Sequence, residues 1–122
     1  MASSLEEVLE AFIGLYTRDA LSRWRELFLP GFTAAATNAD GSVTTWTLEE
    51  FYERQRSLFA SGKPISEVLL APTTHSIGGI ACVRSSFVWT DGTSKRPGQL
   101  VMLLITERGR FKIQSLAFSY HG

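Results

Sequence analysis

Few side chains in this sequence can move a proton near neutral pH. His75 is the single histidine inside a strand-like segment, and an unperturbed imidazole titrates close to neutral pH, which makes His75 a candidate general base. Asp40 is a candidate carboxylate, although its position in the turn Ala39-Asp40-Gly41 also explains it. Tyr16 and Tyr52 carry hydroxyl groups that can polarise a carbonyl by a hydrogen bond. These four residues form the candidate catalytic set.

A second group of side chains could hold an apolar molecule. Aromatic residues occur along the whole chain, and the small residues Ala34-Ala35-Ala36 and Ala81 leave space that larger rings can wall. Neutral polar side chains among them can orient a ligand, although none is a strong acid or base. The candidate ligand-binding residues are Trp24, Asn38, Trp46, Ser85, Phe87, Trp89, Gln114, Phe118 and Tyr120. The same rings could instead fill a core, and this alternative stays open.

The sequence offers no spacing of histidine, cysteine and carboxylate residues that would hold a metal ion. Cys82 is the single cysteine, so an internal disulfide is excluded, and a buried, unreactive thiol is its favoured interpretation. His121 lies next to the C-terminus, where chains fray. We therefore expect neither a metal nor another cofactor.

The charge balance argues against two classes of partner. The formal net charge is zero, from 12 basic and 12 acidic residues, so no long-range field attracts nucleic acid or anionic lipid. The first ten residues contain glutamates and no uninterrupted apolar stretch, and predict neither a signal peptide nor a membrane span. We expect a cytoplasmic protein that binds neither nucleic acid nor membrane.

The first half of the chain predicts three helices. Ser3 or Ser4 can cap the first, whose apolar residues recur at intervals of three and four as far as Tyr16. Thr17 or Asp19 can cap a short second helix, which Pro30-Gly31 would end. A third helix is predicted from the capping-box pair Thr47 and Glu50 to Phe59.

Strand-like segments make up most of the remainder. Residues 32–38 and 42–46 predict a short hairpin around a glycine turn. Four longer runs then follow one another with almost nothing but turns between them: Ile65 to Ile77, Ile80 to Thr90, Gly98 to Glu107 and Phe111 to Tyr120. Helices followed by such a meander predict an α+β fold, in which the N-terminal helices pack on one curved antiparallel sheet.

The turn at Gly78-Gly79 predicts which side chains share a face of that sheet. If this turn has two residues, Ile77 pairs with Ile80, and alternation then assigns every neighbour. The predicted concave face carries Val68, Leu70, Pro72, Thr74, Ala81, Val83, Ser85, Phe87 and Trp89. The opposite face carries His75, together with Glu67 and Arg84, which could pair. A one-residue bulge near Pro72 would reverse the assignment of His75.

The order of these elements resembles the nuclear transport factor 2-like superfamily, which includes ketosteroid isomerases, scytalone dehydratases and SnoaL-like polyketide cyclases. The resemblance covers nearly the whole chain. Its local carriers are Thr17-Arg18-Asp19 leading to Glu26-Leu27-Phe28, Glu50-Phe51-Tyr52, and Gly109-Arg110-Phe111-Lys112-Ile113. It implies a single domain over residues 1–122, with a cystatin-like cone that encloses an apolar pocket.

The resemblance also allows one activity to be tested by position. Ketosteroid isomerases use a catalytic base, an oxyanion-binding tyrosine and a protonated aspartate. The positions that resemble these three groups are Ala36, Ala11 or Phe12, and Val101, and all are apolar here. Tyr52 alone matches, at the position of a supporting tyrosine. We therefore reject ketosteroid isomerisation.

A homodimer is expected from one strand. The segment 98–105 is apolar on both faces, and helices can cover only one face of a sheet. We expect Leu100, Met102 and Leu104 to meet a second copy across the convex face, and the superfamily resemblance implies the same pairing.

Three functional hypotheses follow. The first is a protein that binds a small hydrophobic organic molecule in the cone. The second is a cofactor-free isomerase, cyclase or dehydratase of the SnoaL-like type. The third is a non-catalytic dimerisation module whose aromatic rings fill the cone.

Overall fold

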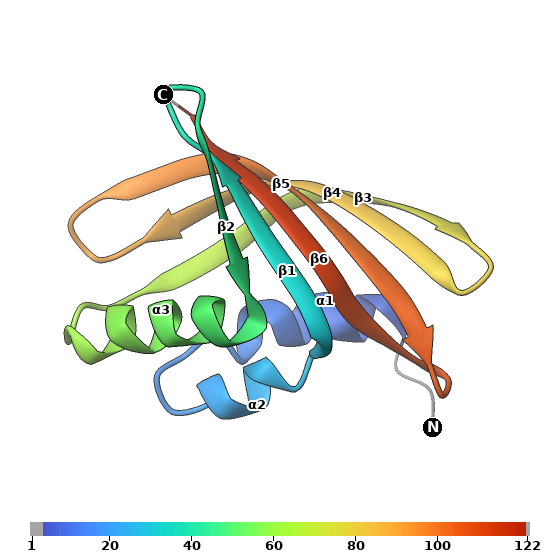
Figure 1. The fold of residues 1–122 in the computed structure, drawn as a ribbon. Coiled ribbons are helices and arrows are strands. Elements are labelled where there is room, and N and C mark those ends of the chain that lie inside the picture. Colours follow the sequence, from blue (N-terminus) through green and yellow to red (C-terminus); the bar gives the residue numbers. More distant parts are fainter. Residues whose placement is uncertain (1–3, 122) are drawn as a thin grey trace.

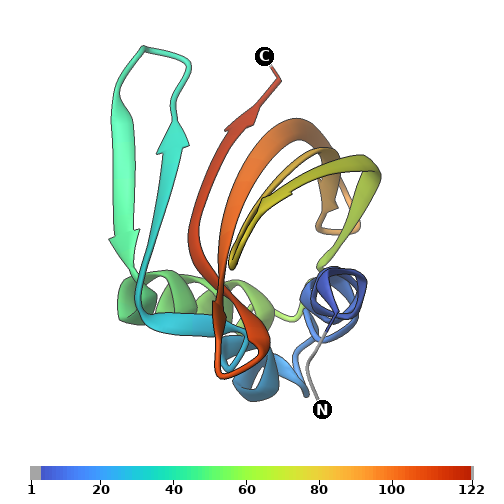
Figure 2. The ribbon, with the colours of Figure 1, turned by 90° about the vertical axis from the view of Figure 1, so that its right-hand side faces the viewer.

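The chain folds into one curved, unclosed sheet with three helices on its concave side (Figure 1). The computed structural model describes residues 4–121. The helices are α1 (Leu5–Gly14), α2 (Leu21–Arg25) and α3 (Leu48–Ala60). The strands are β1 (Phe28–Thr37), β2 (Val43–Thr47), β3 (Ser66–Ile77), β4 (Ile80–Thr90), β5 (Lys95–Glu107) and β6 (Arg110–Tyr120). Figure 2 shows the sheet curling over the helical layer.

The strand order is β2-β1-β6-β5-β4-β3. The expected α+β class, with N-terminal helices on one curved sheet, is therefore confirmed. One pairing differs from the expected antiparallel sheet, because β1 and β6 run parallel. Both strands start at the helical layer and run away from it, so the end of the meander meets the first strand in the same direction (Figure 1).

The first and third helices start at predicted caps, whereas the N-cap of α2 is Ala20, with no side-chain cap, and not Thr17 or Asp19. The Ser4 hydroxyl accepts a hydrogen bond from the Glu7 amide at 3.1 Å, and the Thr47 hydroxyl accepts one from the Glu50 amide at 3.2 Å. Both form complete capping boxes. Ser3, the alternative first cap, lies outside the described residues.

The predicted end of the second helix is wrong. α2 ends at Arg25, and Pro30-Gly31 lies inside β1, which begins at Phe28. The amide of Ile113 donates to the Leu27 carbonyl at 2.9 Å, which brings the chain into the sheet before the proline. The register between β1 and β6 is irregular from Phe28 to Thr33, where Pro30 has no N–H to donate.

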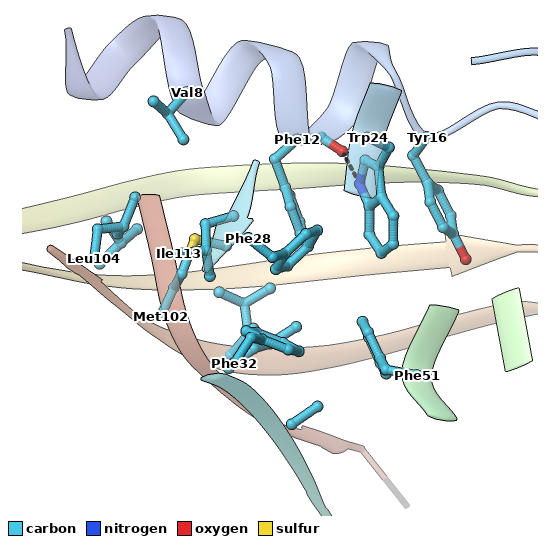
Figure 3. Close-up of a cluster of buried hydrophobic side chains, with 14 of the residues drawn as sticks. Val8, Phe12, Tyr16, Trp24, Phe28, Phe32, Phe51, Met102, Leu104 and Ile113 are labelled. Carbon is cyan, nitrogen blue, oxygen red and sulfur yellow. Dashed lines mark hydrogen bonds between the residues drawn. The ribbon is translucent and has the colours of Figure 1, made fainter. Parts of the chain in front are cut away.

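The core lies between α1, α2 and the middle of the concave face (Figure 3). Trp24 is buried in it, and its indole N–H donates to the Phe12 carbonyl at 3.0 Å. The ring centroids of Trp24 and Phe28 are 4.7 Å apart, and those of Phe28 and Phe32 are 4.6 Å apart. Buried aromatic rings joined in this way fix α1 and α2 against the sheet.

Three residues expected on the convex face belong to this core instead. Leu100, Met102 and Leu104 are 4%, 0% and 0% exposed, because Met102 pairs with the inward-facing Val83. The neighbouring Val101 points outward and is 44% exposed. In a strand that is apolar on both faces, the sequence does not indicate which alternate residues point inward. The pairing of β5 with β4 determines this direction.

A bulge in β3 changes the predicted faces at the N-terminal end of that strand. Ala71 and Pro72 lie opposite Ser85 alone, and Ala71 has a left-handed backbone with φ of 53°. Beyond the bulge, Leu69 pairs with Phe87 and Glu67 pairs with Trp89. Glu67 and Leu69 therefore face the concave side.

The same bulge corrects three further assignments. Val68 and Leu70, expected on the concave face, point outward and are 48% and 49% exposed. Glu67 and Arg84 lie on opposite faces, so the expected ion pair between them is wrong. His75 still pairs with Cys82, as the turn register predicted, because it lies between the turn and the bulge. The bulge thus reverses the direction of Glu67 and not that of His75.

Within residues 4–121, no helix is long and apolar enough to cross a membrane.

Candidate functional site

A cavity of about 240 Å³ lies between the concave face of the sheet and the helices. All three helices and all six strands contribute to its wall. About half of its lining residues are aromatic: Phe12, Tyr16, Trp24, Trp46, Phe51, Phe87, Trp89, Phe118 and Tyr120. Ala36 on β1 supplies the small side chain that leaves room between them. The cone is therefore walled by its rings and not filled by them.

A buried hydrogen-bond network closes one part of this wall. The Tyr16 hydroxyl donates to Gln55 Oε1 at 2.5 Å and accepts from the Trp89 indole N–H at 3.2 Å. Burial raises the pKa of the Tyr16 phenol above its ordinary value. Tyr16 therefore stays protonated, and its hydroxyl links α3 to β4 within the cavity wall.

Glu67 is the titratable group in the cavity that changes charge near neutral pH. Its side chain enters the wall beside Trp89, with which it pairs across β3 and β4. Burial raises the pKa of the Glu67 carboxyl to about 7. Within residues 4–121 this carboxyl has no hydrogen-bond or ion-pair partner. Both its acid and its base form are therefore available to a molecule in the cavity.

Tyr120 presents a second hydroxyl to the cavity. Burial raises the pKa of its phenol, and the nearby Arg96 guanidinium opposes this effect. The hydroxyl makes no hydrogen bond to another side chain of the described residues, so it is free to donate to a ligand oxygen. The Glu67 charge also raises the pKa of Tyr120, so the two groups lie within electrostatic reach of one another.

Two exposed arginines complete the lining. Arg54 on α3 lies over the Trp46 ring, with its guanidinium carbon 5.5 Å from the ring centroid. Arg96 on β5 lies over the Tyr120 ring at 3.9 Å. A cation–π contact of this kind restricts the arginine side chain.

Comparison with protein-family sequence models gives a match to the SnoaL-like domain over residues 5–121. The chain belongs to the SnoaL-like family. This membership confirms the resemblance to the nuclear transport factor 2-like superfamily that the order of elements indicated. A comparison with curated protein sequences found no match.

Solved structures share the SnoaL-like fold at low identity. A protein of unknown function from Mycobacterium tuberculosis is 16% identical, with a TM-score of 0.78, over 96% of this chain and 69% of that chain. An NTF-2 like protein of unknown function from Pseudomonas aeruginosa is 16% identical, with a TM-score of 0.74, over 97% of this chain and 95% of that chain. A protein with a cystatin-like fold from Caulobacter vibrioides is 12% identical, with a TM-score of 0.73, over 97% of this chain and 87% of that chain. These likenesses establish the fold alone.

The SnoaL-like cavity brings together most of the ligand-binding candidates. Those that line it are Trp24, Asn38, Trp46, Phe87, Trp89, Phe118 and Tyr120, together with the catalytic candidate Tyr16. Ser85 lies outside the lining, opposite the β3 bulge, where its hydroxyl donates to the Ser86 carbonyl at 2.7 Å. Gln114 also lies outside, at a register shift between β5 and β6.

Three of the four catalytic candidates lie away from the cavity. Tyr52 is on the outer side of α3, where the Arg25 guanidinium lies 4.8 Å from its ring centroid. His75 is exposed on the convex side of β3. Asp40 is exposed in the β1–β2 turn, where hydrogen bonds from the Ser42 hydroxyl and amide lower the pKa of its carboxyl. None of these three faces the cavity.

The SnoaL-like cavity also contains residues that the sequence analysis missed. Glu67 was assigned to the wrong face, and Pro72 was the signal that could have corrected it, because proline often marks a bulge in a strand. Gln55 lies on the apolar stripe of α3 between Phe51 and Phe59, at intervals of four, and this spacing could have indicated a buried polar group. Arg54 and Arg96 had no comparable signal.

Positions compared with ketosteroid isomerases supply no acid or base here. Ala36 and Phe12 line the cavity with apolar groups, and Val101 lies on the convex face. In the part of the chain that the structure describes, no group of three histidine, cysteine or acidic residues is placed to bind a metal. The chemistry that these side chains offer is proton transfer at Glu67 and hydrogen bonding at Tyr120.

Proposed function

We propose that this SnoaL-like protein binds a small, flat, apolar organic molecule in the cavity of its cone. The observation that carries the proposal is the open space of about 240 Å³ between aromatic walls. Pockets for drug-sized ligands measure about 300 to 1,000 Å³, so this cavity suits a molecule of one or two rings. The open interior favours binding over the dimerisation-module hypothesis, which expected the rings to fill the cone.

The three tryptophans give this proposal a direct test. Trp24, Trp46 and Trp89 all line the cavity, and the chain has no others. Bound aromatic molecules should therefore change intrinsic tryptophan fluorescence in a saturable way. Naphthalene derivatives with small neutral substituents are suitable probes.

One pair of variants separates cavity binding from binding elsewhere. Ala36→Leu places a larger side chain in the cavity, and should abolish the saturable change. Ala35→Leu makes the same substitution at the next residue of β1, which points to the other face, and should preserve it. Equal binding by both variants, with the fold intact by circular dichroism, would contradict the proposal.

A specific observation also favours a second candidate function, which is cofactor-free proton transfer by Glu67. General acid-base catalysis works best when the pKa of the catalytic group lies near the working pH. Burial brings the pKa of Glu67 to about 7, and the carboxyl has no partner among the described residues. This is the carboxylate that the enzyme hypothesis requires, at a residue other than His75 or Asp40.

The reaction class follows from the groups present. In a ketone with a C=C bond one carbon further along, Glu67 accepts a proton from the carbon next to the carbonyl. The electron pair of that C–H bond forms a new C=C bond, and the π electron pair of the carbonyl moves to its oxygen. The Tyr120 hydroxyl donates a hydrogen bond to this oxygen as its negative charge grows. Glu67 then returns the proton to another carbon of the same molecule, which completes an isomerisation without a cofactor. Tyr16 keeps its hydrogen bonds to Gln55 and Trp89 throughout and positions the wall.

Deuterium exchange tests this candidate without knowledge of the natural substrate. In deuterated buffer, the protein should speed incorporation of deuterium next to the carbonyl of 1-tetralone, as measured by NMR. Glu67→Gln should remove the effect while 1-tetralone still binds. Glu10→Gln, the same change at an exposed position of α1, should leave it intact. Saturable binding of 1-tetralone without exchange would leave a binding protein and exclude this proton transfer.

A further inference from the structure

We infer that the ligand of this cavity is an organic acid, whose apolar rings lie among the aromatic side chains and whose carboxylate is bound by Arg54 and Arg96. The inference rests on the proposed binding function and adds the chemical class of the ligand. It makes these two arginines the residues that determine specificity.

The first support is a row of three rings along one wall of the cavity. Trp46 and Phe118 are nearly parallel, with centroids 6.0 Å apart and an interplanar angle of 4°. Phe118 and Tyr120 follow with centroids 5.8 Å apart. An arginine lies over each end of this row, Arg54 over Trp46 and Arg96 over Tyr120. Two cations from distant parts of the chain therefore border the same apolar surface.

The second support is that neither charge is matched. Arg25 is paired with Glu49, and Arg56 with Glu53. Arg54 lies within one helical turn of both Glu53 and Arg56. Within residues 4–121 neither Arg54 nor Arg96 makes an ion pair. Each guanidinium lies over an aromatic ring and makes no hydrogen bond to another residue of the described chain, so its N–H groups are free.

A guanidinium with free N–H groups suits a carboxylate. The guanidinium presents its N–H groups in a planar fork that matches the two oxygens of a carboxylate. The contact with the ring already restricts each arginine before a ligand arrives, so less side-chain freedom is lost on binding. The rings that orient the arginines are the same rings that would contact the apolar part of the ligand.

Glu67 is the carboxylate in the cavity lining, and it does not neutralise the arginines. It lines the same cavity, yet no oxygen of its carboxyl lies within ion-pair distance of either guanidinium. The lining therefore carries two permanent positive charges and one carboxyl that is negative in only part of the molecules at neutral pH. This excess of positive charge is local, since the chain as a whole has a net charge of zero. A ligand with a single negative charge fits it.

The test compares acids with their own primary amides, which have nearly the same size and shape and lack the charge. Isothermal titration calorimetry would measure benzoate, 2-naphthoate and biphenyl-4-carboxylate, each beside its amide. For the pair of best size we expect the acid to bind about tenfold more tightly, which corresponds to about 1.4 kcal/mol. A higher salt concentration should weaken binding of the acid and leave binding of the amide unchanged.

Three variants assign the effect to residues. Arg54→Gln and Arg96→Gln should each reduce the preference for the acid by about threefold or more, with little change in amide binding. Arg56→Gln removes a charge from the same helix on its outer side, and should leave the preference unchanged. All three positions are exposed, so the substitutions should not disturb folding.

Two results would overturn the inference in different ways. Equal affinity for acid and amide would refute the arginine site and leave the apolar cavity standing, as would an equal loss of preference in Arg56→Gln. Absence of saturable binding for every acid and every amide would refute the proposed binding function, and this inference with it.

Discussion

The Glu67 carboxyl should make the stability of the protein depend on pH in a direction opposite to that of most acidic residues. Its pKa in the folded protein is about 7, against an ordinary value of 4.5. The folded state therefore holds this proton more tightly than the unfolded chain. Between those two pKa values the free energy of unfolding should fall as pH rises, because the folded state binds more protons.

The size of the effect follows from the same two values. A shift of one pKa unit corresponds to about 1.4 kcal/mol, so the full difference amounts to about 3 kcal/mol above the folded pKa. Glu67→Gln keeps the shape of the protonated acid and cannot ionise. The free energy of unfolding of the variant should equal that of the wild type at about pH 4, where both side chains are neutral. At about pH 8 it should be higher by about 3 kcal/mol.

Urea unfolding followed by circular dichroism measures this difference at each pH. The wild-type and Glu67→Gln curves should separate progressively from about pH 5 to pH 8. Glu10→Gln is the matched control, because Glu10 is exposed on α1 and its curve should stay with the wild type. A constant difference between wild type and Glu67→Gln at all pH values would refute the argument. It would mean that Glu67 has an ordinary pKa, and the proton-transfer proposal would lose its basis.

Three other substitutions test separate parts of the structure. Tyr16→Phe removes the donor to the buried Gln55, and should lower the free energy of unfolding in urea by about 1 to 3 kcal/mol. Gly98→Ala should destabilise the fold by about 1 to 3 kcal/mol in the same assay, because the new Cβ would lie 2.6 Å from the Phe87 ring. Val101→Lys should convert the expected convex-face dimer to a monomer in light scattering, and a monomeric wild type would contradict that dimer.

Local signals in the sequence predicted the boundaries of most elements. The capping boxes at Ser4 and Thr47 depend on residues three positions apart, and a short range of sequence contains all the information they need. The turn at Gly78-Gly79 fixed the pairing of β3 and β4 up to His75 for the same reason. These predictions needed no knowledge of distant contacts.

The faces of the strands were harder to predict. Alternation gives only two choices, and a single extra residue exchanges them. The bulge at Ala71-Pro72 did so for Glu67, and the pairing with β4 decided the direction of Met102. Most of the predicted aromatic residues line the cavity, whereas its one carboxyl was not predicted there, because the direction of Glu67 depends on one backbone irregularity.

The two proposals for the cavity are connected through charge. An ion pair between Glu67 and Arg54 or Arg96 would lower the pKa of the carboxyl and occupy the guanidinium. Their separation keeps the carboxyl titratable near pH 7 and the arginines free. A bound carboxylate then repels ionised Glu67, while Tyr16 and Tyr120, whose pKa values are raised, stay neutral.

The affinity for 2-naphthoate should therefore fall as pH rises through about 7 in the wild type, and stay constant over that range in Glu67→Gln. Binding of 2-naphthamide should be independent of pH in both proteins, because the amide carries no charge for Glu67 to repel. A pH profile for 2-naphthoate that is the same in wild type and Glu67→Gln would show that the carboxyl and the arginines act on different parts of the cavity.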